Sequence, residues 1–251
     1  SELIPLKVRS LVGLTPLFAV SVIMPEEIEK LHDFKRRLNW FTNYRKTNNK
    51  YLPEERQSNN DTMLLSLVHE KRLVKLLERL LDENEFLSAG GIRAMSKVYG
   101  EQPYAMAILD MDYRVMYDPG DSTSDLFGGN SNWRGPVWMP INYLFIKALE
   151  KYGNFYGDSV KVAFPTGSGN YITLTEVAKK LAERLLSIFQ AQNDNTPVFG
   201  EYNAFYQRPE NKDLIVFHEY FHGDTLKGLG ASHQTGWTAL IADLICAVTS
   251  H

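Results

Sequence analysis

The chain has 251 residues and a mass of 28.7 kDa, a length that suits one large domain or two small ones. Hydrophobic residues make up 44% of it and charged residues 23%, which excludes global disorder. The formal net charge is −3, so the composition offers no basic surface for nucleic acid or for an anionic membrane. The single cysteine, Cys246, excludes an internal disulfide and a thiolate zinc cluster.

The first third of the chain is expected to hold three helices. Residues 11–24 are apolar but too short to span a membrane, and they lack the features of a secretion signal, so we expect a buried helix and a cytoplasmic protein. Pro25 opens the next helix, because proline suits the first helical position. Its apolar stripe runs from Ile28 to Phe41. A third helix is expected at residues 73–81.

The rest of the chain alternates helices with long connections. We expect helices at residues 137–152, 174–192 and 235–249, a hairpin at 104–117 and an extended segment at 214–221. Thr173 and Glu176 form a capping box before one of these helices. Connections longer than about 12–15 residues are uncommon unless they are functional. The residues therefore predict an all-α protein of helical hairpins, with small β pieces in the long loops and a ligand site at one end.

The segment at residues 128–138, Gly-Gly-Asn-Ser-Asn-Trp-Arg-Gly-Pro-Val-Trp, is the first candidate site. Glycine lets a backbone approach a ligand closely, a tryptophan face stacks on a sugar ring, and arginine and asparagine offer donors to hydroxyl groups. A tight turn whose tryptophans fill the core has the same composition. Both interpretations stay open at this point.

The second candidate is the segment from His218 to His222, which has the His-Glu-x-x-His order of zinc peptidases. That chemistry requires both histidines on one face of a helix. The preceding residues favour a strand, on which positions four apart are roughly 13 Å apart and cannot share one ion. We therefore prefer Glu219 as a general base that activates water, although an ordinary ion-paired glutamate has the same pattern. A zinc peptidase stays as a minor alternative.

A third candidate lies at residues 228–237, where small residues lead into a helix. His233 and Trp237 give this segment a polar rim that can also stack on a ligand. The order of glycines does not match a phosphate-binding loop.

Together these segments resemble glycoside hydrolase family 63, the processing α-glucosidase-type enzymes, and in particular its large bacterial members. The resemblance covers essentially the whole chain, which we treat as a single domain, residues 1–251. It rests on residues 11–19, on Phe86-Leu87-Ser88 with Gly91-Ile92-Arg93, on Asn132-Trp133-Arg134-Gly135-Pro136-Val137-Trp138 with Asn142-Tyr143, and on Glu219-Tyr220-Phe221-His222-Gly223 with Gln234-Thr235-Gly236-Trp237-Thr238.

The resemblance implies a catalytic (α/α)6 barrel that hydrolyses an α-glycosidic bond of an oligosaccharide or glycoside with inversion, without a metal or other cofactor. It implies that Glu219 is the general base. The sugar site is implied to be lined by Trp133, Arg134, Gly135 and Trp138, with His233 and Trp237 as further contacts.

The chain departs from the family pattern in one important respect. The family's general acid is an aspartate in an earlier part of the barrel, and no segment here resembles it. Asp121, Asp224 and Glu201 are possible substitutes, and the sequence selects none of them. We therefore expect the C-terminal part of an inverting α-glycosidase domain, inactive by itself, that contacts a missing N-terminal half or self-associates. A non-catalytic carbohydrate- or partner-binding module is the alternative.

Overall fold

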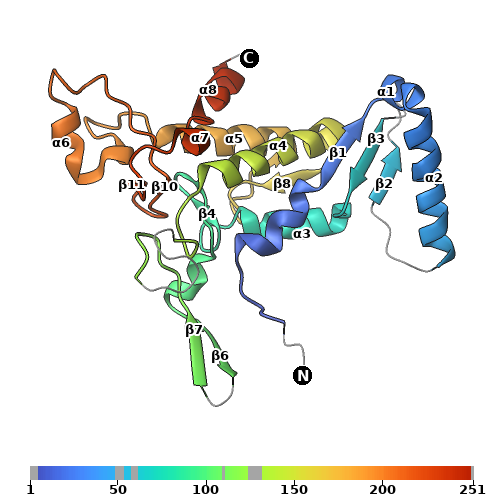
Figure 1. The fold of residues 1–251 in the computed structure, drawn as a ribbon, viewed down its shortest axis with the longest axis horizontal. Coiled ribbons are helices and arrows are strands. Elements are labelled where there is room, and N and C mark those ends of the chain that lie inside the picture. Colours follow the sequence, from blue (N-terminus) through green and yellow to red (C-terminus); the bar gives the residue numbers. More distant parts are fainter. Residues whose placement is uncertain (1–4, 49–53, 58–61, 109–110, 124–131, 250–251) are drawn as a thin grey trace.

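Two helices that lie side by side, α4 (Met139–Tyr156) and α5 (Leu174–Ser187), form the centre of the molecule (Figure 1). The computed structural model describes residues 5–48, 54–57, 62–108, 111–123 and 132–249. Helix α3 (Glu70–Leu80) runs along one side of this pair and α8 (Ile241–Thr249) packs on α5. The main hydrophobic core lies between these helices.

The strands are short and form small antiparallel sheets. One sheet has three strands in the order β1–β3–β2, and four further pairs are hairpins. The strands are β1 (Val20–Ile23), β2 (Glu54–Gln57), β3 (Met63–Ser66), β4 (Leu87–Ser88), β5 (Gly91–Ile92), β6 (Tyr104–Ile108), β7 (Met111–Val115), β8 (Lys161–Ala163), β9 (Tyr171–Thr173), β10 (Tyr220–Phe221) and β11 (Gly228–Leu229).

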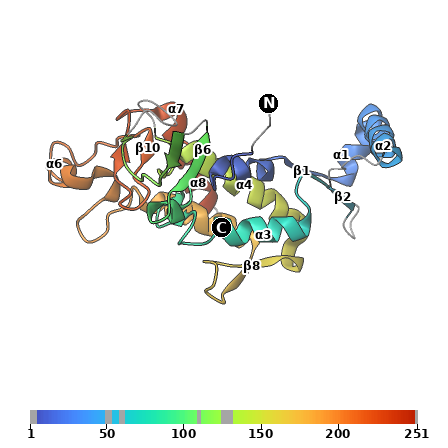
Figure 2. The same cartoon turned by 90° about the horizontal axis from the view of Figure 1, so that it is seen from below.

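The remaining helices are short or lie away from the centre. They are η1 (Leu11–Phe18), α1 (Pro25–Lys30), α2 (His32–Thr47), η2 (Lys97–Gly100), η3 (Gly157–Ser159), η4 (Pro197–Tyr202), α6 (Asn203–Tyr206) and α7 (Thr235–Thr238). Figures 1 and 2 show α2 at one end of the molecule and α6 at the other, with the β6–β7 hairpin projecting from the body.

Several expected elements are confirmed. Helix α3, the β6–β7 hairpin and the capping box of Thr173 and Glu176 at the start of α5 are all present. In that box the Glu176 backbone N–H donates to Thr173 Oγ1, and the Thr173 backbone N–H donates to the Glu176 carboxylate. Each bond satisfies an N–H group that would otherwise lack a partner at the end of the helix.

Other expected elements are corrected. Residues 11–24 form the 3₁₀ helix η1 followed by strand β1, since Pro16 interrupts a regular α-helix. The C-terminal helix is divided into α7 and α8, and only the last two residues of the expected extended segment 214–221 form a strand. The irregular segment before it contains η4 and α6.

The helix predicted from Pro25 also differs from expectation. It is broken at Leu31 into α1 and α2, and no residue of α2 is buried. Leu31, Phe34 and Phe41, which the helical spacing placed on a buried stripe, are 48%, 40% and 38% exposed. Periodicity identified the helix correctly, but the described residues bury little of its apolar face.

This helical architecture with small β pieces agrees with the class predicted from the sequence, and the partial (α/α)6 barrel of helical hairpins stays a prediction. Among the described residues, no helix has the length and apolar character needed to cross a membrane.

The close approach of α4 to α5 at Gly153 can be tested by substitution of this glycine. A Cβ atom at this position would lie 2.6 Å from the backbone nitrogen of Thr175. Alanine normally stabilises a helix by about 1 kcal/mol relative to glycine, but here the clash reverses the sign. We expect Gly153→Ala to lower the free energy of unfolding by about 1–3 kcal/mol in urea denaturation.

Gly13 is the control, because a Cβ at that position meets nothing within 4 Å. Gly13→Ala is expected to change the free energy of unfolding by less than about 0.5 kcal/mol. Equal stability of the two variants would contradict the described α4–α5 contact.

Candidate functional site

Glu219 lies immediately before β10, at the open end of the β10–β11 hairpin. Its backbone N–H donates to the carbonyl oxygen of Ala231 at 2.9 Å, and the Ala231 N–H donates to Glu219 Oε2 at 3.1 Å. The hairpin therefore fixes both the backbone and the carboxylate of Glu219. The side chain is neither fully buried nor fully exposed, so the carboxylate is held in place and still accessible.

The absence of a side chain at Gly230 lets the Glu219 carboxylate and the ring of Tyr220 lie close to each other. Gly230 has φ +69°, and a Cβ there would lie 2.8 Å from Glu219 Oε2 and 2.6 Å from Tyr220 Cε1. A side chain at this position would therefore displace one group or the other. The carboxylate and the edge of the phenol ring thus border the same small space.

Three rings stack beside this carboxylate. Trp138 lies between Trp133, with ring centroids 4.0 Å apart and planes 1° apart, and Tyr220, with centroids 4.7 Å apart. Trp237 packs on Trp138 at 5.6 Å with a tilt of 60°. The indole N–H of Trp138 donates to the carbonyl oxygen of Asn132 at 3.1 Å. Trp138 is only 1% exposed, so it is the centre of the stack and has no open face.

Trp133 is the ring of this stack that faces a cavity. Trp133 lines a cavity of about 550 Å³ together with residues near the N-terminus and residues 94–95. Of the residues predicted to contact sugar, Trp133 therefore offers a stacking surface, while Trp138 supports it from behind.

Arg134 is buried rather than open to a ligand. Its side chain is 6% exposed and its Nη2 donates to Asp118 Oδ2 at 2.8 Å. The backbone of Gly135 passes close to the same loop, because a Cβ on Gly135 would lie 2.6 Å from the carbonyl oxygen of Asp118. Both residues of the motif thus hold the neighbouring loop in the described structure, and a direct contact with sugar stays a prediction for each.

The three candidate segments of the sequence meet at this place. Val137 and Phe221 exchange two backbone hydrogen bonds of 2.8 and 2.9 Å, which join the tryptophan segment to the hairpin that follows Glu219. Strand β11 starts the third segment. His233 is exposed, with its ring tilted against Phe217 at 5.7 Å.

The His-Glu-x-x-His order does not form a metal-binding helix. Residues 214–221 are irregular or extended, and His222 Nδ1 accepts hydrogen bonds from the backbone N–H groups of Asp224 and Thr225 at 3.1 and 3.2 Å. Burial lowers the pKa of His222, so the neutral imidazole that can accept these bonds is favoured. Within the ranges that the structure describes, no three His, Cys, Asp or Glu side chains are placed to hold a metal ion.

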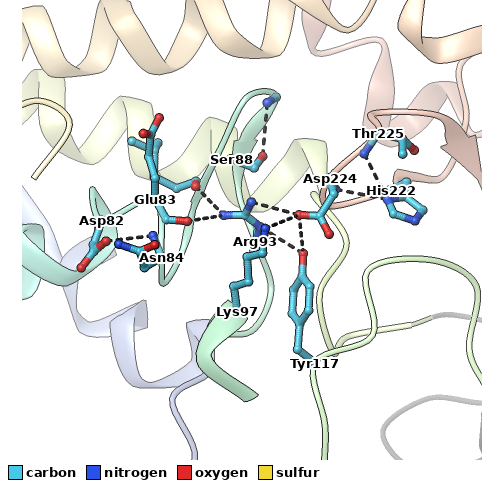
Figure 3. Close-up of polar contacts among 12 residues, drawn as sticks. Asp82, Glu83, Asn84, Ser88, Arg93, Lys97, Tyr117, His222, Asp224 and Thr225 are labelled. Atoms are coloured by element: carbon cyan, nitrogen blue, oxygen red, sulfur yellow. Dashed lines mark hydrogen bonds and ion pairs between the residues drawn. The ribbon is translucent and has the colours of Figure 1, made fainter. Parts of the chain in front are cut away.

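A buried arginine fastens the other end of the hairpin (Figure 3). Arg93 is 5% exposed, and its guanidinium donates to Asp224 Oδ1 at 3.1 Å and to the hydroxyl of Tyr117 at 3.0 Å. Tyr117 also donates to Asp224 Oδ1 at 3.1 Å, and Lys97 lies 3.5 Å from the same oxygen. The sequence did not predict this cluster, because its members are far apart along the chain and share no motif.

The substitute acids named from the sequence differ in their surroundings. Burial raises the pKa of Asp224, but the Arg93 guanidinium and Lys97 outweigh it and hold that pKa below its usual range. The hydrogen bond from Lys227 lowers the pKa of Glu201. A general acid must hold its proton, so neither carboxyl group suits that role. Asp121 accepts a hydrogen bond from the Tyr220 hydroxyl at 3.2 Å.

Substitution of Asp224 tests the contribution of the Arg93 cluster to stability. Asp224→Ala leaves a buried guanidinium without its carboxylate, so we expect the free energy of unfolding at pH 7 to fall by about 2 kcal/mol or more. The lowered pKa of Asp224 means that its contribution is present above the unfolded pKa, about 3.9, and is lost as the pH falls through the folded value. The difference between wild type and variant should therefore shrink below about pH 4 in urea denaturation.

Asp213→Asn is the control, because Asp213 is an exposed carboxylate away from this cluster. It should leave stability within about 0.5 kcal/mol at either pH. A loss of stability in Asp224→Ala that is independent of pH would show that the ion pair is not its cause.

Comparison with known proteins places this site in a family. The model described as "Mannosylglycerate hydrolase MGH1-like glycoside hydrolase domain" matches residues 34–238. The "Uncharacterized protein YMR196W" of Saccharomyces cerevisiae is 43% identical over 250 residues, which are 98% of this chain and 23% of that protein. The "Mannosyl-oligosaccharide glucosidase" of the same yeast is 34% identical over 122 residues, 48% of this chain and 12% of that protein.

The "Probable mannosyl-oligosaccharide glucosidase" of Schizosaccharomyces pombe is 27% identical over 175 residues, 69% of this chain and 15% of that protein. The chain thus spans less than a quarter of the length of each of these curated relatives. The resemblance to glycoside hydrolase family 63 is confirmed, and the chain belongs to the MGH1-like glycoside hydrolase family.

Proposed function

We propose that this chain supplies the general base of an inverting α-glycosidase, and that Glu219 is this base. The observation that carries the proposal is the position of the Glu219 carboxylate, which is held by the Ala231 N–H beside the ring stack and remains accessible. A base that activates water needs such a fixed carboxylate within reach of the sugar. The related mannosyl-oligosaccharide glucosidases point to an oligosaccharide as the substrate.

We place the general acid outside these 251 residues. Inverting hydrolysis needs a second carboxyl group, about 6.5–9.5 Å from the base across the scissile bond. Two of the three substitutes from this chain, Asp224 and Glu201, have lowered pKa values and paired oxygens. The relatives are also more than four times as long as the matched segment. The isolated chain is therefore proposed to bind sugar with little or no turnover.

Further polypeptide is proposed to cover the exposed apolar surface. Leu31 between α1 and α2, Phe34 and Trp40 on α2, and Val12 in the lining of the Trp133 cavity are all exposed. Monomeric proteins rarely leave such surfaces open. We propose contact with the rest of a longer protein, or self-association of the isolated chain. The cytoplasmic location expected from the sequence remains a prediction.

The central test is Glu219→Gln, measured on the complete natural polypeptide that contains these residues. Glutamine keeps the size of the side chain but cannot take a proton, so we expect kcat for an α-glucoside or α-mannoside to fall by about 10²–10⁴-fold. The binding constant of the sugar should change little. Release of reducing sugar measures the first quantity and calorimetry measures the second.

Glu210→Gln serves as the control, because Glu210 is exposed in the segment after α6. Full activity of Glu219→Gln would refute the assignment of the base. A protein that binds oligosaccharide but never hydrolyses it, even as the complete polypeptide, would favour a carbohydrate-binding module.

Trp133 gives a separate test of the sugar site. Trp133→Ala removes the ring face that lines the cavity and is expected to weaken oligosaccharide binding about tenfold, corresponding to about 1.4 kcal/mol. Trp40→Ala removes an indole of similar size that is 65% exposed on α2, away from the stack, and is expected to leave binding unchanged. Calorimetric titration of both variants compares the effects directly, and equal affinities would place the sugar elsewhere.

A further inference from the structure

The surface loop at residues 118–123 is unusually well fixed. The buried Arg134 donates through Nη2 to Asp118 Oδ2 at 2.8 Å and to Ser122 Oγ at 3.3 Å. Thr123 donates to the same Asp118 oxygen through its hydroxyl at 2.6 Å and its backbone N–H at 3.2 Å. The Asp118 carboxylate therefore closes the loop on itself and fastens it to Arg134.

A second buried side chain supports the same loop. Asn132, with no exposed surface, donates through Nδ2 to the carbonyl oxygens of Asp118 at 2.7 Å and Gly120 at 2.8 Å. The N–H of Gly223 donates to the carbonyl oxygen of Pro119 at 2.9 Å. The burial of polar groups is costly unless they are hydrogen-bonded. Asn132 Nδ2 and Arg134 Nη2 find their partners in this loop, whereas Arg134 Nε has none among the described residues. The conformation of the loop is thus set before any ligand binds.

This fixed loop presents Asp121 to solvent beside the candidate site. Asp121 is exposed, and its Oδ1 accepts the hydrogen bond from the Tyr220 hydroxyl. The Tyr220 ring is buried against Trp138, and its edge borders the same space at Gly230 as the Glu219 carboxylate. Burial, followed by the charge of Asp121, raises the pKa of Tyr220, so the hydroxyl keeps its proton and acts as the donor.

The chemistry of this arrangement suits a sugar. A carboxylate has about four lone-pair positions, and of the residues that the structure describes only Tyr220 donates to Asp121, so further positions remain for donors from a ligand. Hydroxyl groups are the donors that a sugar offers. Binding sites work best when the contacting group is held rigidly by side chains behind it.

We propose that Asp121 is a substrate-binding residue that accepts hydrogen bonds from hydroxyl groups of the glycoside whose bond Glu219 acts on. This inference rests on the proposed function. It assigns Asn132 and Arg134, which the motif suggested as donors to sugar hydroxyl groups, to positioning, and it assigns the contact to Asp121. The hydrogen-bonding hydroxyl groups of the sugar then determine how tightly the substrate binds at this loop.

The test compares Asp121→Ala and Asp121→Asn with Asp112→Asn in the complete natural polypeptide. Asp112 is an exposed aspartate on β7, so its variant matches the change in charge without touching the loop. Calorimetry with glucose- and mannose-terminated oligosaccharides gives Kd, and hydrolysis of the same sugars gives KM and kcat. We expect Asp121→Ala to raise Kd and KM about tenfold to a hundredfold, with kcat changed less than about threefold.

Sugars that each lack one hydroxyl group identify the hydroxyl that donates to Asp121. If Asp121 accepts from a given hydroxyl, the sugar lacking that hydroxyl should bind wild type about tenfold more weakly and bind Asp121→Ala with no further loss. Tyr220→Phe, which removes the donor to Asp121 Oδ1, should raise Kd by a smaller factor. Asp121→Ala should unfold at the wild-type urea concentration, which separates loss of contact from loss of fold.

Two results overturn the inference. An unchanged Kd in Asp121→Ala shows that the carboxylate does not contact the sugar. A fall in kcat of a hundredfold or more for alkyl glycosides, with aryl glycosides of good leaving groups unaffected, identifies Asp121 as the general acid instead. If wild type binds no sugar and Glu219→Gln has no effect, the proposed function itself fails.

Discussion

The pair of backbone hydrogen bonds between Val137 and Phe221 is the contact on which the candidate site depends. It joins the tryptophan segment to the hairpin that follows Glu219, and both residues have no exposed surface. Since strand β10 is only two residues long, it has little stability as a hairpin alone. Stacking of Tyr220 on Trp138 and the ion pair of Arg93 with Asp224, in the turn that follows, hold this hairpin in place. The position of Glu219 is therefore a consequence of tertiary packing rather than of local structure.

Two buried arginines share the work of fixing the surrounding loops. Arg134 pairs with Asp118 and Arg93 pairs with Asp224, and the Tyr117 ring lies between the two regions, in contact with Gly135 and hydrogen-bonded to Arg93. Burial of a guanidinium costs free energy that a single ion pair barely offsets, so such groups are better explained by the geometry that they specify than by stability. Here they fix irregular backbone that no helix or sheet supports.

Sequence patterns predicted the parts of this structure that local physics decides. Capping and helical spacing identified α3 and α5. The family resemblance implied that Trp133 and Glu219 belong to one site, and that assignment stays a prediction. Sequence patterns did not predict which residues of these elements are buried. The same spacing that buries Leu77 in α3 leaves Phe41 exposed in α2, because burial depends on which element lies opposite. The Arg93 cluster was not predicted either, because its members are far apart along the chain.

The motif around Trp133 also shows why recognisable residues need not be the ones that touch a ligand. Trp138, Asn132 and Arg134 are distinctive in sequence, yet each is buried and makes its contacts within the protein. They support two accessible groups, Trp133, which stacks on Trp138, and Asp121, which accepts the hydrogen bond from Tyr220 next to Glu219 in the chain. Precise positioning of a few contacts requires many more residues behind them, since each support must be packed and hydrogen-bonded itself. A motif of this kind marks where a site is built, and we propose that the groups that contact the sugar lie at its edges.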